Sequence, residues 1–113
     1  MHEMSIAESI AQIAEEAAMR DGGSAIRRVF VEIGALAGVE AEALRFCWDA
    51  VTRSGCAAGA DLDIIRTPGQ AWCLQCSATV ALGAPYEPCP RCGGYEVQVT
   101  GGTEMRVKEI EVE

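Results

Sequence analysis

The sequence predicts an α+β fold: a small mixed three-stranded sheet with two helices packed on it, and a second, smaller domain inserted before the last strand. Three observations lead to this prediction. Two stretches repeat apolar residues at helical spacing, three others alternate them at strand spacing, and four of the six cysteines gather in one segment that also holds glycines and prolines. The predicted domains are residues 1–69 with 100–113, and an insertion at residues 70–99.

The first helix is expected from about Ser5 to Arg20. Ser5 and Glu8 form the S-x-x-E pattern of a capping box, which satisfies free backbone amides at a helix start. The sequence Asp21-Gly22-Gly23 supplies the stop signal. Residues at helical spacing are expected to form the buried stripe: Ile6, Ile10, Ile13 and Ala17.

A strand and a second helix follow. The strand is expected over residues 26–33, where Val29, Val31 and Ile33 occupy every second position. The helix is expected from about Glu40 to Ser54. Its apolar positions follow the i, i+3, i+4, i+7 rule: Leu44, Cys47, Trp48 and Val51.

Two more strands complete the predicted sheet. One is expected at Asp61–Thr67 and the last at Thr103–Val112. The alternation changes parity between Val107 and Ile110, which predicts a β-bulge. Because the last strand should rejoin the sheet of the first half, the cysteine segment between these two strands is predicted to be an insertion.

The cysteine segment carries two C-x-x-C pairs, Cys73 with Cys76 and Cys89 with Cys92, separated by twelve residues. Each pair can present two thiolates to one ion, and the two pairs together complete a tetrahedron. The segment has too few large apolar residues for a core of its own. A structural zinc, worth about 10–16 kcal/mol of apparent binding free energy at neutral pH, would hold it together. The sequence therefore predicts a zinc-ribbon-like domain with four cysteine ligands, whose closed site has no catalytic role.

Other interpretations of the cysteines stay open at this point. Iron could occupy the same four-thiolate cage, since the second pair resembles a rubredoxin knuckle, and a redox dithiol would need only one pair. Iron would colour the purified protein red. Cys47 and Cys56 lie outside the motif, and both are expected to be structural.

The composition disfavours nucleic-acid-binding, membrane and secreted proteins. The formal net charge is −8, which disfavours a nucleic-acid partner, because binding to phosphates relies on Lys and Arg. No apolar run approaches the roughly 18 residues of a membrane helix. The N-terminus lacks the basic region of a signal peptide. We therefore expect a cytoplasmic protein with reduced thiols, no membrane and no nucleic acid, in which six cysteines indicate metal rather than disulfides.

The only histidine is the second residue. The free amine of Met1, the amide nitrogen and imidazole of His2, and a donor from Glu3 can close fused chelate rings around one ion. Nitrogen donors in a plane suit Ni(II) and Cu(II) better than zinc. The alternative is an exposed histidine on a frayed terminus.

The hexapeptide Met1-His2-Glu3-Met4-Ser5-Ile6, followed near the end by a four-cysteine segment of this spacing, resembles the HypA/HybF family of hydrogenase-maturation nickel metallochaperones. The resemblance covers the whole chain. Met4 departs from the family pattern, which commonly has leucine there. Further matches are Val31-Glu32-Ile33-Gly34, Gly38-Val39-Glu40, Leu44-Arg45-Phe46 and Gly101-Gly102-Thr103-Glu104-Met105.

The resemblance implies a carrier of Ni(II) as cargo, with a structural Zn(II). It implies that His2 is the essential nickel ligand, that Glu3 supplies a backbone amide with its side chain as a further candidate donor, and that Glu40 sits where some members place an acidic residue near nickel. An alternative role for Glu40 is that of a helix-start carboxylate favoured by the dipole. The implied partners are a nickel-binding maturation GTPase of the HypB kind and the hydrogenase large subunit; some members serve urease, and a homodimer is plausible at this size.

Two other classes of function compete with the carrier. A zinc-ribbon module for nucleic acid would need a basic face with exposed aromatics, and a zinc ribbon can also serve protein interaction. An enzyme would need a base beside a nucleophile, or an open metal position. The single histidine is terminal and the zinc ligands are complete, so the chain is predicted not to be an enzyme.

Overall fold

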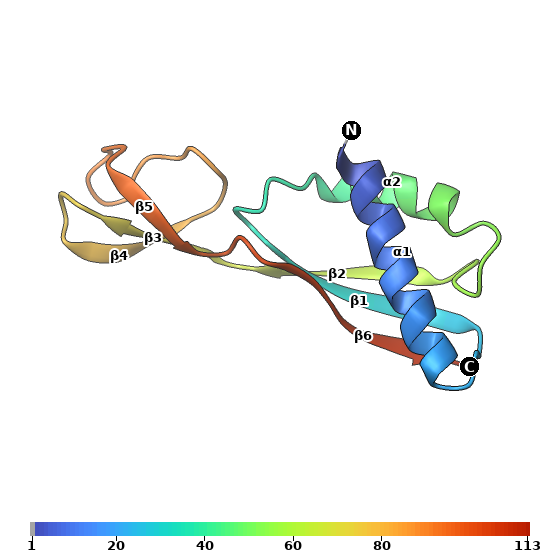
Figure 1. Ribbon diagram of the computed structural model, residues 1–113. Coiled ribbons are helices and arrows are strands. Elements are labelled where there is room, and N and C mark those ends of the chain that lie inside the picture. Colours follow the sequence, from blue (N-terminus) through green and yellow to red (C-terminus); the bar gives the residue numbers. More distant parts are fainter. Residues whose placement is uncertain (1) are drawn as a thin grey trace. The chain divides into compact units, whose positions relative to one another are not determined.

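The computed structural model describes residues 2–113 and has the predicted α+β fold, with two helices and two three-stranded sheets (Figure 1). The chain forms two compact units. The helical unit takes in the chain up to Val31, Val39–Ile65 and Arg106–Glu113, and the cysteine unit takes in Glu32–Gly38 and Arg66–Met105. The elements in chain order are α1 (His2–Arg20), β1 (Ile26–Gly34), α2 (Ala41–Val51), β2 (Asp61–Thr67), β3 (Gly69–Cys73), β4 (Ala78–Leu82), β5 (Val97–Gly101) and β6 (Met105–Val112).

The first sheet has the strand order β2-β1-β6. At one end of β1 the Glu113 amide donates to the Ala25 carbonyl, and at the other end the Gly34 amide donates to the Glu104 carbonyl. Because the chain numbers run in opposite directions along this pair, β6 is antiparallel to β1. The last strand therefore rejoins the sheet of the first half, as the sequence predicted.

On the other side of β1, the strand β2 runs parallel. The Ile26 amide donates to the Cys56 carbonyl, and the Ala35 amide donates to the Thr67 carbonyl, so the numbers rise together. Parallel neighbours need a crossover connection, and α2 supplies it. The sheet is therefore mixed, as expected.

The first helix begins earlier than predicted. It starts at His2, so the S-x-x-E pattern at Ser5 lies inside the helix rather than at its start. No Gly or Pro interrupts the first residues, and Glu3 in the first turn is favoured by the helix dipole. The consequence is that His2 belongs to the regular helix instead of preceding it by a flexible stretch.

The buried face of α1 also differs from the prediction. Ile13 is 50% exposed, and Ile6 and Ala17 are only half-buried. Small side chains let a helix approach its neighbours closely, so the alanine-rich face packs inward and the bulkier Ile13 faces out. The buried apolar residues are Ala7, Ile10, Ala11, Ala14 and Ala18.

The predicted stop of α1 is confirmed. The Gly23 amide donates to the Ala18 carbonyl at 2.8 Å, and the Gly22 amide donates to the Met19 carbonyl at 3.3 Å. This pair of bonds is the Schellman pattern, and it requires the left-handed backbone that Gly22 adopts at φ 101°.

The second helix follows its predicted pattern over a shorter span, Ala41–Val51. Leu44 and Trp48 are buried, and the Trp48 indole donates to the Ala60 carbonyl at 2.9 Å. Cys47 is half-buried rather than fully buried. The predicted buried stripe is therefore correct at its centre, whereas Cys47 and Val51 at its edge are only half-buried.

The cysteine unit contains a sheet of order β4-β3-β5, with both neighbours antiparallel to β3. The segment has more core than its sequence suggested. Leu36 comes from the connection between β1 and α2 and completes a small apolar cluster. The members of this cluster are Leu36, Ala71, Cys73, Val80, Leu82 and Cys89.

The functional division of the chain, with nickel in one predicted domain and zinc at residues 70–99, stays a prediction. The cysteine unit reaches beyond that range on both sides and includes residues 32–38. Among residues 2–113, neither helix has the length and apolar character needed to cross a membrane.

Candidate metal centres

The four motif cysteines lie on two matched turns. The first turn leaves the end of β3, where the Cys76 amide donates to the Cys73 sulfur at 3.4 Å. In the second turn the Arg91 amide donates to the Cys89 sulfur, also at 3.4 Å. N–H groups aimed at a sulfur favour its thiolate form. Each turn therefore points a backbone N–H at the sulfur of its first cysteine.

A left-handed residue follows each pair of cysteines. Ser77 has φ 49° and Gly93 has φ 75°. At the second turn the Gly93 amide donates to the Cys89 carbonyl at 2.8 Å, and the Cys89 amide donates to the Gly94 carbonyl at 2.7 Å. Glycine adopts this backbone without strain, so the sequence after the second knuckle is suited to the tight turn.

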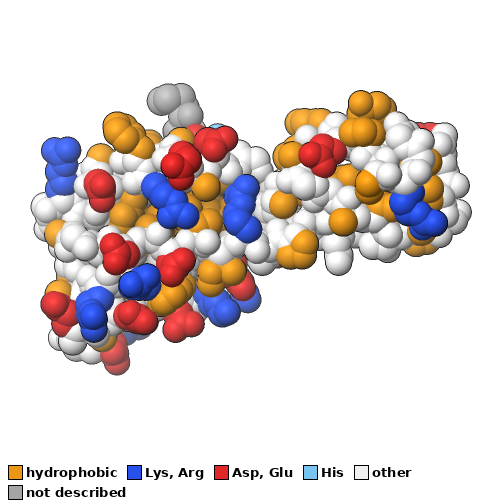
Figure 2. Space-filling model, turned by 180° about the vertical axis from the view of Figure 1, so that it is seen from behind, with side chains coloured by type: hydrophobic (Ala, Val, Ile, Leu, Met, Phe, Trp, Pro, Cys, Tyr) orange, Lys and Arg blue, Asp and Glu red, His pale blue; other side chains and the backbone are white. Residues whose placement is uncertain are grey.

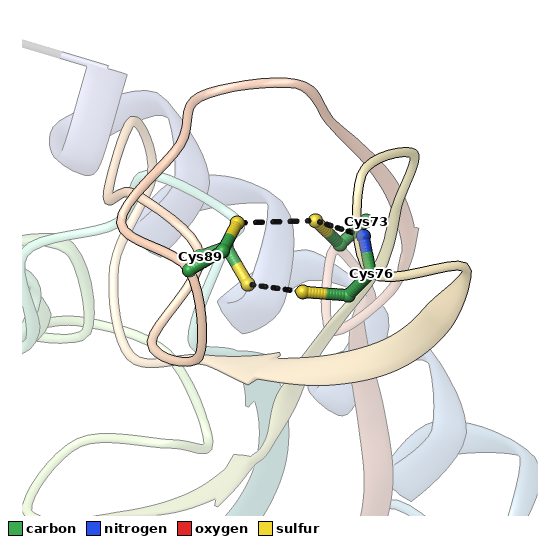
Figure 3. Close-up of side chains that lie close together, drawn as sticks. Cys73, Cys76 and Cys89 are labelled. Carbon is green, nitrogen blue, oxygen red and sulfur yellow. Dashed lines mark hydrogen bonds between the residues drawn. The ribbon is translucent and has the colours of Figure 1, made fainter.

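The sulfur atoms converge on a common centre, as Figure 3 shows for Cys73, Cys76 and Cys89. The Cys73–Cys92 sulfur distance is 3.7 Å and the Cys76–Cys89 distance is 3.9 Å. All four sulfurs lie within 4.8 Å of one another. A tetrahedron with Zn–S bonds of about 2.3 Å has edges of about 3.8 Å. The donor set and the spacing therefore fit one tetrahedral thiolate-bound ion.

The thiols differ in acidity. A thiol hydrogen bond with Cys92, together with burial, raises the pKa of Cys76 to about 12. Burial works in the same direction at Cys89, but hydrogen bonds from the backbone N–H groups of Cys92 and Arg91 and from the thiols of Cys73 and Cys92 together outweigh it and lower the pKa of Cys89 to about 7. An incoming ion would therefore meet a thiolate first at Cys89 and would displace a proton from Cys76.

Gln75 belongs to this site, although the sequence did not single it out. It lies between the first two cysteines, and its amide oxygen is 3.7 Å from the Cys92 sulfur. Its amide nitrogen donates to a Glu96 carboxylate oxygen at 3.0 Å. Its position inside a C-x-x-C turn is the only sequence signal that could have indicated a contact with the opposite knuckle.

The second predicted site lies at the start of α1. The imidazole Nε2 of His2 is 3.1 Å from Oε2 of Glu3. The same oxygen accepts a hydrogen bond of 3.1 Å from the backbone amide of Glu40. The structure thus brings together three of the four predicted residues, and Met1 lies outside the described part of the chain.

The two acidic residues of this group play different parts. Glu3 is buried, and the hydrogen bond from the Glu40 amide holds the pKa of the Glu3 carboxyl below its usual value. Glu40 is the N-cap residue of α2, and its own side chain makes no capping hydrogen bond. Glu40 therefore joins the group through its backbone, while Glu3 joins through its carboxylate.

A family model described as "Hydrogenase/urease nickel incorporation, metallochaperone, hypA" matches residues 1–112. The chain belongs to the HypA family. The family is described as one of metallochaperones, and its relatives carry the name of maturation factors. The resemblance found in the N-terminal hexapeptide and the cysteine spacing is therefore confirmed.

Several HypA proteins match this chain over its whole length. Proteins called hydrogenase maturation factor HypA from Albidiferax ferrireducens and Azotobacter vinelandii are 56% and 54% identical to it over 113 residues, all of this chain and all of each relative. The solution structure of the Ni metallochaperone HypA from Helicobacter pylori covers 99% of this chain and 97% of its own, with a TM-score of 0.66 and 27% identity. A second HypA solution structure has a TM-score of 0.67 and 28% identity, and covers 100% of this chain and 97% of its own.

Proposed function

We propose that this protein is a nickel metallochaperone that binds Ni(II) at its N-terminus and delivers it to the nickel site of a maturing nickel-iron hydrogenase. The observation that carries the proposal is the match of residues 1–112 to a family of nickel-incorporation proteins. The description of that family also names urease, which makes urease a second class of recipient.

The nickel ligands in this proposal are the amine of Met1, the amide nitrogen and imidazole of His2, and a donor from Glu3. His2 is the only histidine, and nickel prefers nitrogen donors in a plane. Glu40 is a further acidic residue of this group, since its backbone amide is bonded to Glu3. A site made of neighbouring residues at a chain end can be dismantled by a partner that offers competing ligands.

A structural zinc in the cage of Cys73, Cys76, Cys89 and Cys92 is the second part of the proposal. The sulfur spacing supports a tetrahedral ion, and four thiolates leave no open coordination position. When bound, zinc would supply charge that keeps the four sulfurs ionised. The cysteines hold the ion and thereby fasten the two knuckles of the unit to each other.

The proposed partners are a nickel-binding GTPase of the HypB kind and the hydrogenase large subunit, met in the cytoplasm, with a homodimer as the proposed assembly. The cysteine unit exposes Tyr86 and Tyr95, at 96% and 72%. The face in Figure 2 shows far fewer charged side chains on this unit than on the helical unit. Aromatic residues with few charges are typical of protein interfaces, which supports a docking role for the cysteine unit.

A nickel titration of the zinc-loaded protein with its native N-terminus tests the proposal. Absorption spectra should show about one Ni(II) per chain in a planar site, as expected for nitrogen donors of this kind. His2→Ala and a chain extended by one glycine before Met1 should both lose this spectrum. Equal nickel binding by all three proteins would show that the nickel ligands lie elsewhere in the chain. The chain would still belong to the family, but the proposed N-terminal nickel site would be excluded.

The proposed nickel site should also weaken in acid. The amine, the amide and the imidazole must all lose protons before they bind a metal. Nickel affinity is therefore expected to fall from neutral to mildly acidic pH before zinc is lost, and affinity measured across that range checks it. A flat profile would exclude this ligand set.

A further inference from the structure

We propose that Gln75 is a positioning residue of the cysteine cage: its side chain, anchored on Glu96, lies against the exposed sulfur of Cys92 and limits the access of competing ligands to a bound ion. The inference rests on the structural zinc of the proposed function and is independent of the nickel site. It assigns a role to a side chain that lies inside a C-x-x-C turn and is not itself a ligand.

Cys92 is the exposed ligand of the cage. Cys73 and Cys89 are buried, and Cys76 is half-buried. An ion held by four thiolates has no open coordination position, so a competing ligand must first replace one of the sulfurs. The exposed sulfur is the one that such a ligand reaches, and the rate of release therefore depends on what lies over Cys92.

The Gln75 side chain reaches Cys92 from the opposite turn. The Cys92 thiol donates to Oε1 of Gln75 at 3.7 Å, and Nε2 of Gln75 donates to Oε1 of Glu96 at 3.0 Å. The backbone runs alongside, since the Leu74 amide donates to the Glu96 carbonyl at 2.9 Å. A side chain whose end is held in this way loses the freedom to swing away from the sulfur.

The contact does not depend on the protonation of Cys92. A glutamine amide offers one carbonyl oxygen and two N–H donors. Its oxygen accepts from a thiol, and its NH2 group has one hydrogen for Glu96 and one for a metal-bound sulfur. Donors of this kind behind a metal ligand are typical of the outer shell of metal sites.

Gly94 leaves the space that this side chain occupies. A Cβ at Gly94 would come 3.1 Å from Oε1 of Gln75 and 3.5 Å from the sulfur of Cys92. The first distance is shorter than side chains normally allow, whereas the second is an ordinary contact. Gly94 does not share the positive φ of Gly93, so its backbone conformation alone does not require glycine. The absence of a side chain here therefore leaves room for Gln75 over the sulfur.

Transfer of zinc from the loaded full chain to a colorimetric chelator tests the inference. Loss of an outer-shell partner typically costs about 10–100-fold in metal affinity. Because Gln75 is exposed, Gln75→Ala is expected at the lower end of that range, with about 10-fold faster release. Gln75→Met has nearly the same length but cannot bond to Glu96, and it should release zinc almost as fast. Gln98→Ala, on an exposed glutamine of the same unit, should release zinc at the wild-type rate.

A second substitution disturbs the same contact from the other side. Gly94→Ala places a methyl group against Oε1 of Gln75 and should also speed release. In the Gln75→Ala background that methyl group keeps only its ordinary contact with Cys92, so the double variant should release zinc no faster than Gln75→Ala alone. Two independent effects on the stability of the unit would add instead.

Side-chain NH2 signals in 1H–15N spectra of the zinc-loaded chain give a direct readout of the anchor. The Gln75 pair should exchange with solvent more slowly than the Gln98 pair. Equal exchange, wild-type release rates in both Gln75 variants, or additive effects of Gln75→Ala and Gly94→Ala would each overturn the inference. A chain whose four cysteines took up no zinc would exclude the structural zinc of the proposed function as well, so metal content separates the two failures.

Discussion

Glu3, which lies on α1, supplies a hydrogen-bond acceptor that the first turn of α2 lacks. In a capping box a glutamate at the third helical position accepts the backbone N–H of the N-cap residue. The third residue of α2 is Ala43, which cannot do this, and Glu3 of α1 accepts the Glu40 amide instead. The capping signal at Ser5 and Glu8 was wrong for α1, and no local pattern around α2 indicates a cap that comes from a residue 37 positions earlier.

This contact should make stability depend on pH. The pKa of Glu3 is held below its usual 4.5, so its contribution is complete above that value and is lost as pH falls through the lowered pKa. Wild type should therefore be more stable than Glu3→Gln near neutral pH, and the difference should shrink toward zero in acid. Thermal unfolding of both proteins across this range checks the expectation. A difference that stays constant with pH would show that the charge of Glu3 is not involved.

At the scale of elements, the sequence predicted best where large side chains define a face. Leu44 and Trp48 were predicted to lie on the buried face of α2, and both are buried. On α1 the isoleucines suggested a face that includes Ile13, but the alanines are buried instead. Hydrophobic spacing cannot separate these two faces, because both repeat at helical intervals and only the neighbouring elements decide how close the helix must come.

A pair of substitutions on α2 tests this assignment. Leu44 is fully buried and Phe46 is 82% exposed. Leu44→Ala should lower the free energy of unfolding by about 2–5 kcal/mol, because it leaves a cavity. Phe46→Ala should change it by less than about 0.5 kcal/mol, as surface substitutions do. Denaturant unfolding of the two variants measures both values, and a larger loss in Phe46→Ala than in Leu44→Ala would contradict the packing described for α2.

At the scale of the whole molecule, the cysteine spacing predicted the sulfur cluster. The sequence did not predict which other residues belong to the cysteine unit. The four cysteines meet as expected, since C-x-x-C turns need only local geometry. Leu36 could not be assigned to them from the sequence, because it precedes Cys73 by a helix and two strands. Long-range packing of that kind depends on topology rather than on local pattern.

Removing the proposed zinc should disorder the cysteine unit selectively. Its apolar cluster is small, whereas a structural zinc contributes about 10–16 kcal/mol of apparent binding free energy at neutral pH. Chelation is expected to erase the amide signals of β3, β4 and β5 in 1H–15N spectra and to leave those of α1 and α2.

Substitutions of single cysteines supply the matched comparison. Cys89→Ser should reproduce the effect of the chelator in untreated protein, whereas Cys47→Ser, outside the cluster, should retain both zinc and spectrum. A complete spectrum after full metal removal would show that the apolar cluster alone is sufficient to fold the unit.

Leu36 also limits how relatives can be recombined. The segment Glu32–Gly38 belongs to the cysteine unit although α2 and β2 separate it from the metal ligands along the chain. A chimaera in which only residues 70–99 were replaced by those of a relative would receive all four cysteines from that relative. It would keep its own Leu36, which would then pack against side chains from the relative. The metal-binding motif of this chain therefore cannot be exchanged by itself. The two segments of the cysteine unit, Glu32–Gly38 and Arg66–Met105, would have to be exchanged together.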